Sequence, residues 1–192
     1  MASQSSQETV SSPEEELILV DHNDRETGFQ TKFQCHQGDG VLHRAFSIFL
    51  FNDVRQMLIQ QRSVQKLLWG LCWSNSVCSH PRKGEAMEEA VQRRLKEEMG
   101  VAVPLTYLYK FEYQARYKNI GIEHELCWVY IGKVMDKIKV HPDEIADCKF
   151  INIDELEEAM RQRPDLYTPW FHLEWAYIKK HHWTDIQHLW KA

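Results

Sequence analysis

The sequence has 192 residues, of which 43% are hydrophobic and 27% are charged, and its net charge is −5. A chain of this length and composition is typical of one globular domain that needs neither disulfides nor a metal to form its core. The negative net charge argues against a general nucleic-acid or membrane-surface binder, because such proteins are basic.

Residues 1–15 are rich in Ser, Gln, Glu and Pro, which predicts a disordered tail ahead of one domain over residues 16–192. The tail lacks the basic and apolar regions of a signal peptide. No stretch approaches the roughly 20 apolar residues of a membrane span. The five cysteines include no CxxC pair. We therefore expect a cytoplasmic protein with reduced thiols and no membrane partner.

The first half of the domain reads as strands joined by polar segments. Residues 17–20 begin a strand, and residues 24–43 read as a long loop with room for a short helix. Two apolar segments, residues 45–51 and 57–61, are joined by a polar turn and predict a hairpin. Gly70 then starts a second loop, which carries a thiol.

The second half contains the strongest helical pattern of the chain. Apolar residues recur at helical spacing over residues 85–99, and Gly100 follows where a helix commonly ends. The order of all these elements predicts one α/β sandwich domain. The remaining strands are expected over residues 106–117, 126–134 and 149–153, and the remaining helices over residues 155–162, with Asp154 as N-cap, 170–180 and 184–190.

Two adjacent carboxylates, Glu97 and Glu98, lie in the last turn of the helix over residues 85–99, where the helix dipole is negative. One interpretation is that Arg93 and Arg94, four residues earlier, pair with them on a solvated face. The other interpretation is a divalent cation such as Mg²⁺ at the helix end.

Cys78 and His80 lie in a Ser- and Asn-rich loop directly before this helix. Alone, each would be a buried or surface residue without a task. Together they suit a proton donor or acceptor and a metal ligand. Glu123 and Glu125 alternate along a strand and so share one face, which is either a solvated edge or a pair of close carboxylates that needs a proton or a cation.

Two further histidines, His36 and His43, lie in the first loop and are commonplace when taken singly. With His80 and the two carboxylates they make a set of three nitrogens and two oxygens, which suits Mg²⁺, Mn²⁺ or Zn²⁺. Four basic residues flank the same segments and together would hold a diphosphate: Lys32, Arg62, Lys66 and Arg94.

The helix pattern resembles the Nudix box, with differences at Ser79 and Arg94. A longer set of motifs, between about residues 17 and 175, resembles the type I isopentenyl-diphosphate isomerases, which are Nudix-fold enzymes. The matching runs are His36-x6-His43, Gln61-Arg62-Ser63-x2-Lys66, Ser74-Asn75-Ser76-Val77-Cys78-Ser79-His80-Pro81, Glu85-x7-Arg93-Arg94-x3-Glu98-x-Gly100, Tyr113, Glu123-His124-Glu125 and Thr168-Pro169-Trp170-Phe171.

This resemblance implies a single Nudix-type α/β/α sandwich with a mixed sheet and a catalytic helix at about residues 85–99. It implies isomerisation of isopentenyl diphosphate to dimethylallyl diphosphate in isoprenoid biosynthesis, and we expect a monomer. The implied acid/base groups are Cys78 and Glu125, on opposite faces of the alkene, with Tyr113 assisting proton delivery. The implied ligands of one divalent ion are His36, His43, His80, Glu123 and Glu125. Glu98 is implied as a ligand of a second, substrate-bridging Mg²⁺. The implied diphosphate contacts are Lys32, Arg62, Lys66 and Arg94.

The proposed reaction passes through a carbocation-like state, for which Trp170 or Trp175 would supply a π face. Two other functions remain open from the sequence. A Nudix pyrophosphohydrolase would use Glu97 and Glu98 but leaves Cys78 without a task. A metal-binding or thiol-sensing domain would leave the basic residues unexplained.

Overall fold

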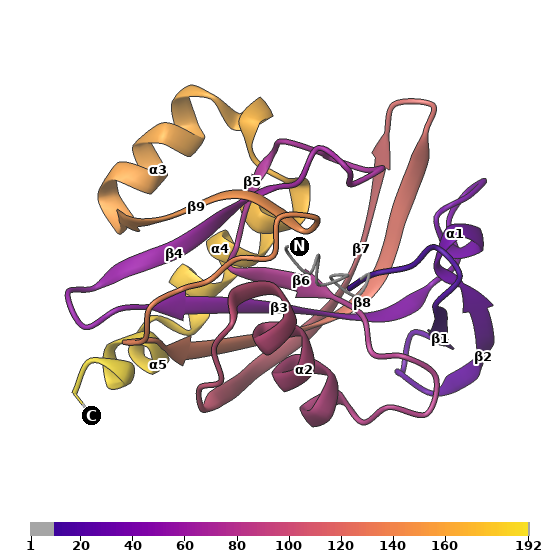
Figure 1. Ribbon diagram of the computed structural model, residues 1–192, viewed down its shortest axis with the longest axis horizontal. Helices are drawn as coiled ribbons and strands as arrows, with labels where there is room; N and C mark the ends of the chain where they lie inside the picture. The colour runs from indigo at the N-terminus through magenta and orange to yellow at the C-terminus, as the bar shows by residue number, and fades with distance from the viewer. Residues whose placement is uncertain (1–9, 192) are drawn as a thin grey trace, which may run out of the picture.

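The computed structural model describes residues 10–191 and arranges them as a mixed β-sheet between two layers of helices (Figure 1). The strands are β1 (Glu16–Val20), β2 (Glu26–Thr31), β3 (His43–Phe51), β4 (Gln56–Arg62), β5 (Trp73–Ser74), β6 (Val77–Ser79), β7 (Leu105–Tyr117), β8 (Gly121–Lys133) and β9 (Ile145–Asn152). The helices are α1 (Lys32–Cys35), α2 (Met87–Met99), α3 (Ile153–Gln162), α4 (Pro169–His181) and α5 (Trp183–Leu189), with a 3-10 turn at Pro164–Leu166.

Strand β3 is the centre of this sheet. It runs parallel to β8 along its whole length and antiparallel to β6 on its other side. Its apolar sequence allows both faces to be buried, as expected for a strand covered on two sides. Phe46 and Ile48 pack against α2, whereas Phe49 and Phe51 pack toward α3, α4 and α5. The predicted α/β/α sandwich is therefore confirmed.

The predicted hairpin of β3 and β4 is paired only beside its turn. Farther along, the two strands separate, and residues 74–76, which we call the polar wedge, fill the gap. The Ser76 hydroxyl donates to the carbonyl of Leu58 (2.6 Å) and accepts from the N–H of Leu50 (2.8 Å). The wedge thus satisfies buried backbone groups that the separated strands cannot satisfy for each other.

Several predicted boundaries change in the structure. The first loop contains the short helix α1 but also β2, which pairs with β1 although its sequence does not alternate. Helix α2 begins at Met87, two residues later than predicted. Glu85 lies in the turn before the helix, where its carboxylate accepts hydrogen bonds from the Arg82 backbone N–H and from the Arg93 side chain. The Asp154 cap is wrong, since Asn152 occupies the N-cap position of α3. Gly100 ends α2 in the predicted left-handed conformation, with φ of 70°.

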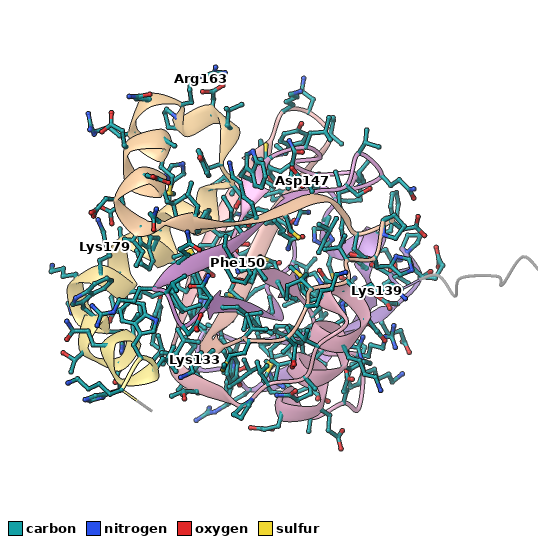
Figure 2. All side chains as sticks on the ribbon, turned by 60° about the vertical axis from the view of Figure 1, so that its left-hand side comes forward. Lys133, Lys139, Asp147, Phe150, Arg163 and Lys179 are labelled. Atoms are coloured by element: carbon teal, nitrogen blue, oxygen red, sulfur yellow. The ribbon has the colours of Figure 1, made fainter. Side chains whose placement is uncertain are left out.

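The periphery of the domain is polar. Figure 2 shows side chains filling the space between sheet and helices, whereas Arg163, after α3, and Lys179, on α4, lie at the outside.

Residues 1–9 of the expected tail lie outside the described residues, and residues 10–15 run against α1, where the Pro13 carbonyl accepts from the N–H of Phe33. Among residues 10–191, no helix is long and apolar enough to cross a membrane.

We predict that Ser76→Ala lowers the free energy of unfolding by about 3 kcal/mol, because it leaves a buried N–H and a buried carbonyl unpaired. Urea unfolding followed by circular dichroism measures this change. The matched control is Thr184→Ala, which removes an exposed hydroxyl on α5 and should change stability by less than about 0.5 kcal/mol. Equal stability of the two variants would show that the wedge is dispensable.

Candidate active site

A cavity of about 360 Å³ opens beside the polar wedge, where β6, β7 and β8 meet α1 and α4. It gathers most of the side chains that the sequence singled out. The predicted residues that line it are Lys32, His36, Arg62, Lys66, Cys78, His80, Tyr113, Glu123, Glu125 and Trp170. Apolar side chains, including Phe33, Leu67 and Leu68, complete its wall.

The strand register explains how residues far apart in sequence meet here. The parallel pairing of β3 and β8 places His43 beside Glu125, and the antiparallel pairing of β7 and β8 places Tyr113 beside the same carboxylate. Alternation along β8 puts Glu123 on the same face. Cys78 lies on β6, so β3 separates the strand of the thiol from the strand of Glu125.

The predicted metal ligands form one buried cluster. One ligand atom from each of five residues lies within 4.8 Å of the others: His36, His43, His80, Glu123 and Glu125. The Nδ1 atoms of His36 and His43 bond to the carbonyls of Lys32 (2.5 Å) and Val41 (2.7 Å), so both Nε2 atoms are left for the cluster.

The Nε2 atom of His43 is the clearest sign of a ligand. It is buried and has no hydrogen-bond partner within the described part of the chain. A buried nitrogen without a partner is costly unless a ligand binds it. This donor set of three histidines and two carboxylates therefore fits a divalent metal ion.

The pKa values of the two carboxylates in the cluster are shifted in opposite directions. Although burial alone would raise it, the charge of His36 lowers the pKa of Glu123 to about 2. Burial, followed by the charge of Glu123, raises the pKa of Glu125 well above its ordinary value. The Tyr113 hydroxyl donates to Oε2 of Glu125 at 2.6 Å. Glu125 is thus the member of the pair that readily holds a proton.

The Cys78 thiol is held by the polar wedge. It donates to Oδ1 of Asn75 at 2.8 Å, and the amide of Asn75 donates to the carbonyls of Ile48 (3.2 Å) and Val77 (2.9 Å). The indole N–H of Trp170 donates to the sulfur at 3.2 Å. Burial raises the pKa of Cys78 to about 12, so the resting group is a thiol.

Basic side chains crowd one end of the cavity, where the nearby carboxylate of Glu144 pairs with Lys66 but not with Lys32. Lys66 pairs with Glu144, and the Nζ of Lys32 donates to the hydroxyl of Ser11 at 2.6 Å. Burial, followed by the charges of Lys66 and Arg94, lowers the pKa of Lys32 to about 8. An anion bound here would relieve this repulsion, which fits a phosphate group.

Four predicted residues do not line the cavity: His43, which belongs to the buried cluster, Glu98, Arg94 and Trp175. Arg94 is buried between Glu98 (2.7 Å) and Glu144 (3.0 Å), and its Nη1 donates to the carbonyl of Val10 at 2.8 Å. The helix end is thus occupied by ion pairs with arginine, as one of the two interpretations expected, but Arg94 and Glu98 are buried and do not lie on a solvated face. Trp175 is buried beside Phe49, and its N–H bonds to Glu157.

Sequence reasoning missed two buried acids near the site. Glu144 lies in the irregular segment before β9, where no pattern marks it. Glu174 lies on α4 among Trp170, Phe171 and Ile178, all buried. Glu174 occupies a position at which the helical spacing of α4 calls for an apolar residue. This departure from the pattern could have identified it as a buried acid from the sequence.

The NUDIX domain model matches residues 41–171. The isopentenyl-diphosphate Delta-isomerase 1 of Photorhabdus laumondii is 42% identical over 174 residues, which are 90% of this chain and 99% of that enzyme. The isopentenyl-diphosphate Delta-isomerase of Pectobacterium atrosepticum is 42% identical over 166 residues, which are 86% and 92% of the two chains.

Solved structures support the fold. The crystal structure of DR0079 from Deinococcus radiodurans is similar with a TM-score of 0.64 and 22% identity, over 77% of this chain and 90% of that chain. The MutT protein of Methanosarcina mazei is similar with a TM-score of 0.53 and 15% identity, over 61% and 81% of the two chains. At these identities the likeness concerns the fold.

We predict that His43→Ala weakens the binding of a divalent metal by about 100-fold or more, because it removes a buried ligand. Isothermal titration with Mn²⁺ measures the affinity. His188→Ala, an exposed histidine on α5, is the matched control and should bind as the unaltered chain does. Unchanged affinity in His43→Ala would exclude the cluster as the metal site.

Proposed function

The chain belongs to the isopentenyl-diphosphate Delta-isomerases within the NUDIX domain family, and from this membership we propose how its site works. The reaction is the isomerisation of isopentenyl diphosphate to dimethylallyl diphosphate. The observation that carries the proposal is that Cys78 and Glu125 line one cavity from strands on either side of β3.

The diphosphate binds at the basic end of the cavity in this proposal. Lys32, Arg62 and Lys66 line that end and would contact its oxygens. Arg94 would join them when a diphosphate oxygen replaces the Val10 carbonyl that now accepts from it. This binding energy, far from the reacting carbons, holds the small apolar end of the substrate in place.

Two divalent metals have proposed ligands. His36, His43, His80, Glu123 and Glu125 would hold Mg²⁺, Mn²⁺ or Zn²⁺, which would withdraw charge from Glu125 and so tune its acidity. Glu98 would contribute to a Mg²⁺ carried by the diphosphate, after Arg94 turns from Glu98 toward the substrate.

The proton transfers need two groups on different sides of the alkene. One group gives a proton to the terminal carbon, which leaves a tertiary cation, and the other removes a proton from the carbon next to that cation. Cys78 and Glu125 would take these roles, with the Tyr113 hydroxyl passing protons at Oε2 of Glu125.

The cationic state is the costly point of this reaction. The Trp170 indole lines the cavity and would stabilise the cation by about 2 kcal/mol where water is excluded. Its N–H contact with sulfur would also stabilise Cys78 when the thiol gives up its proton. Trp175, which lies in the core, has no such position.

A pyrophosphohydrolase is the less favoured alternative. It would use both Glu97 and Glu98 as metal ligands, so both would have to leave their arginine partners, whereas the proposed isomerase needs only Glu98 to do so. In this chain Glu97 pairs with Arg93 (3.0 Å), and Glu98 pairs with Arg94 (2.7 Å). A hydrolase would also leave Cys78 without a role.

One assay separates the functions. The metal-loaded enzyme is incubated with isopentenyl diphosphate and Mg²⁺, and the allylic product is measured by its acid lability. We expect dimethylallyl diphosphate and no released phosphate. Cleavage of a diphosphate without isomerisation would favour the hydrolase, and neither product would favour a binding domain.

We predict that Cys78→Ser and Glu125→Gln each lower kcat by about 1,000-fold, because each removes a group that exchanges a proton with the substrate. Cys148→Ser on β9 and Glu155→Gln on α3 are matched controls outside the cavity and should retain kcat. Circular dichroism verifies that the folds survive. Near-native kcat in Cys78→Ser or Glu125→Gln would refute the role of that residue.

A further inference from the structure

Leu68 is a buried aliphatic side chain in the cavity wall that the proposed mechanism does not use. It lies in the loop between β4 and β5 and is 5% exposed. Its neighbour Leu67 and the aromatic Phe33 line the same cavity, but they are 58% and 51% exposed. Leu67 and Phe33 therefore lie toward the mouth of the cavity, whereas Leu68 belongs to its interior.

The main chain of Leu68 connects this apolar wall to the proposed diphosphate site. The Nη2 atom of Arg62 donates to the carbonyl of Leu68 at 3.1 Å. The same guanidinium lies over the ring of Trp170, 5.2 Å from the ring centroid. The indole N–H of Trp170 in turn donates to the sulfur of Cys78. Leu68 thus lies beside the path that leads from the anion contact to the proposed acid/base group.

Leu68 is also fixed from behind. A Cβ atom on Gly121, the first residue of β8, would lie 2.9 Å from Cδ2 of Leu68, so the glycine allows the leucine to pack directly on the strand. Leu68 also shares a buried cluster with Trp69, Tyr113 and Trp170. Because the interior is close-packed, the leucine cannot withdraw from the cavity without moving these neighbours.

The proposed isomerisation brings a branched alkene to this wall. The diphosphate occupies the basic end of the cavity, so the branched carbon and its methyl group lie at the inner end, between Cys78 and Glu125. The reacting carbons have to lie close to both groups. A branch larger than methyl would need the space that Leu68 fills, and overpacking of that kind displaces the alkene or strains the wall.

We propose that Leu68 limits the size of the alkyl branch that this isomerase accepts, which makes it a specificity-determining residue for a methyl-branched substrate. This inference rests on the proposed isomerisation. The side chain carries no charge and exchanges no proton, so it acts by its shape. One additional methylene in a hydrophobic pocket changes kcat/KM by roughly 10- to 200-fold, which sets the size of the expected discrimination.

Two substrates test this proposal. They are isopentenyl diphosphate and its homologue with an ethyl group in place of the methyl branch. The value of kcat/KM is measured for each with metal-loaded enzyme and Mg²⁺, from the acid-labile product. For the unaltered chain we expect kcat/KM to be at least about 10-fold lower for the homologue. In Leu68→Ala, which opens the wall, the ratio of the two values should shift by about 10-fold or more toward the homologue.

Leu71→Ala is the matched control, since Leu71 lies in the same loop but is exposed and does not line the cavity. This variant should retain both values of kcat/KM. Leu68→Val removes a single methylene and should shift the ratio in the same direction as Leu68→Ala. It carries the test if circular dichroism shows that the alanine variant does not fold.

Two results would overturn the proposal. One is an unaltered chain that uses both substrates equally well. The other is a ratio in the folded Leu68 variants equal to that of the unaltered chain, because a parallel loss with both substrates would assign Leu68 to packing alone. An unaltered chain that isomerises neither substrate would refute the isomerisation itself, which is a different outcome.

Discussion

The polar wedge of residues 74–76 is the constraint on which the site depends. Strands β3 and β4 separate beyond their turn, and buried backbone groups along them would be unpaired without it. Ser76 bridges the two strands, while Asn75 fixes the thiol of Cys78 through its Oδ1 atom. The same side chains that close a gap in the sheet therefore also place the proposed acid/base group.

Electrostatics divides the cavity into three regions with separate tasks. At one end, burial and the charges of Lys66 and Arg94 lower the pKa of Lys32, and the crowded positive charge favours an anion. At the other end, a buried cluster with an unpartnered His43 nitrogen fits a metal. On the cavity wall, burial raises the pKa of both Cys78 and Glu125, the second of which also belongs to this cluster, so the resting groups hold protons. A diphosphate with a small alkene suits a cavity that carries these three sets of groups.

The sequence predicted local elements and the cluster of three histidines and two glutamates better than other long-range contacts. Alternation along β8 sufficed to put Glu123 and Glu125 on one face, and helical spacing sufficed for α2. Strand β2 was missed because its pairing with β1, not its own pattern, makes it a strand. The ion pairs of Arg94 with Glu98 and Glu144 involve a residue 50 positions away, which no local pattern reveals. Trp175 was indistinguishable from Trp170 until the packing of α4 was known.

The most direct test of the account is a crystal structure of Glu125→Gln with a divalent metal and isopentenyl diphosphate. The proposed mechanism predicts the diphosphate on Lys32, Arg62 and Lys66, and the alkene between Cys78 and residue 125, with the sulfur about 3.5 Å from a reacting carbon. A diphosphate bound at the histidine cluster, or an alkene outside the gap between β6 and β8, would contradict it.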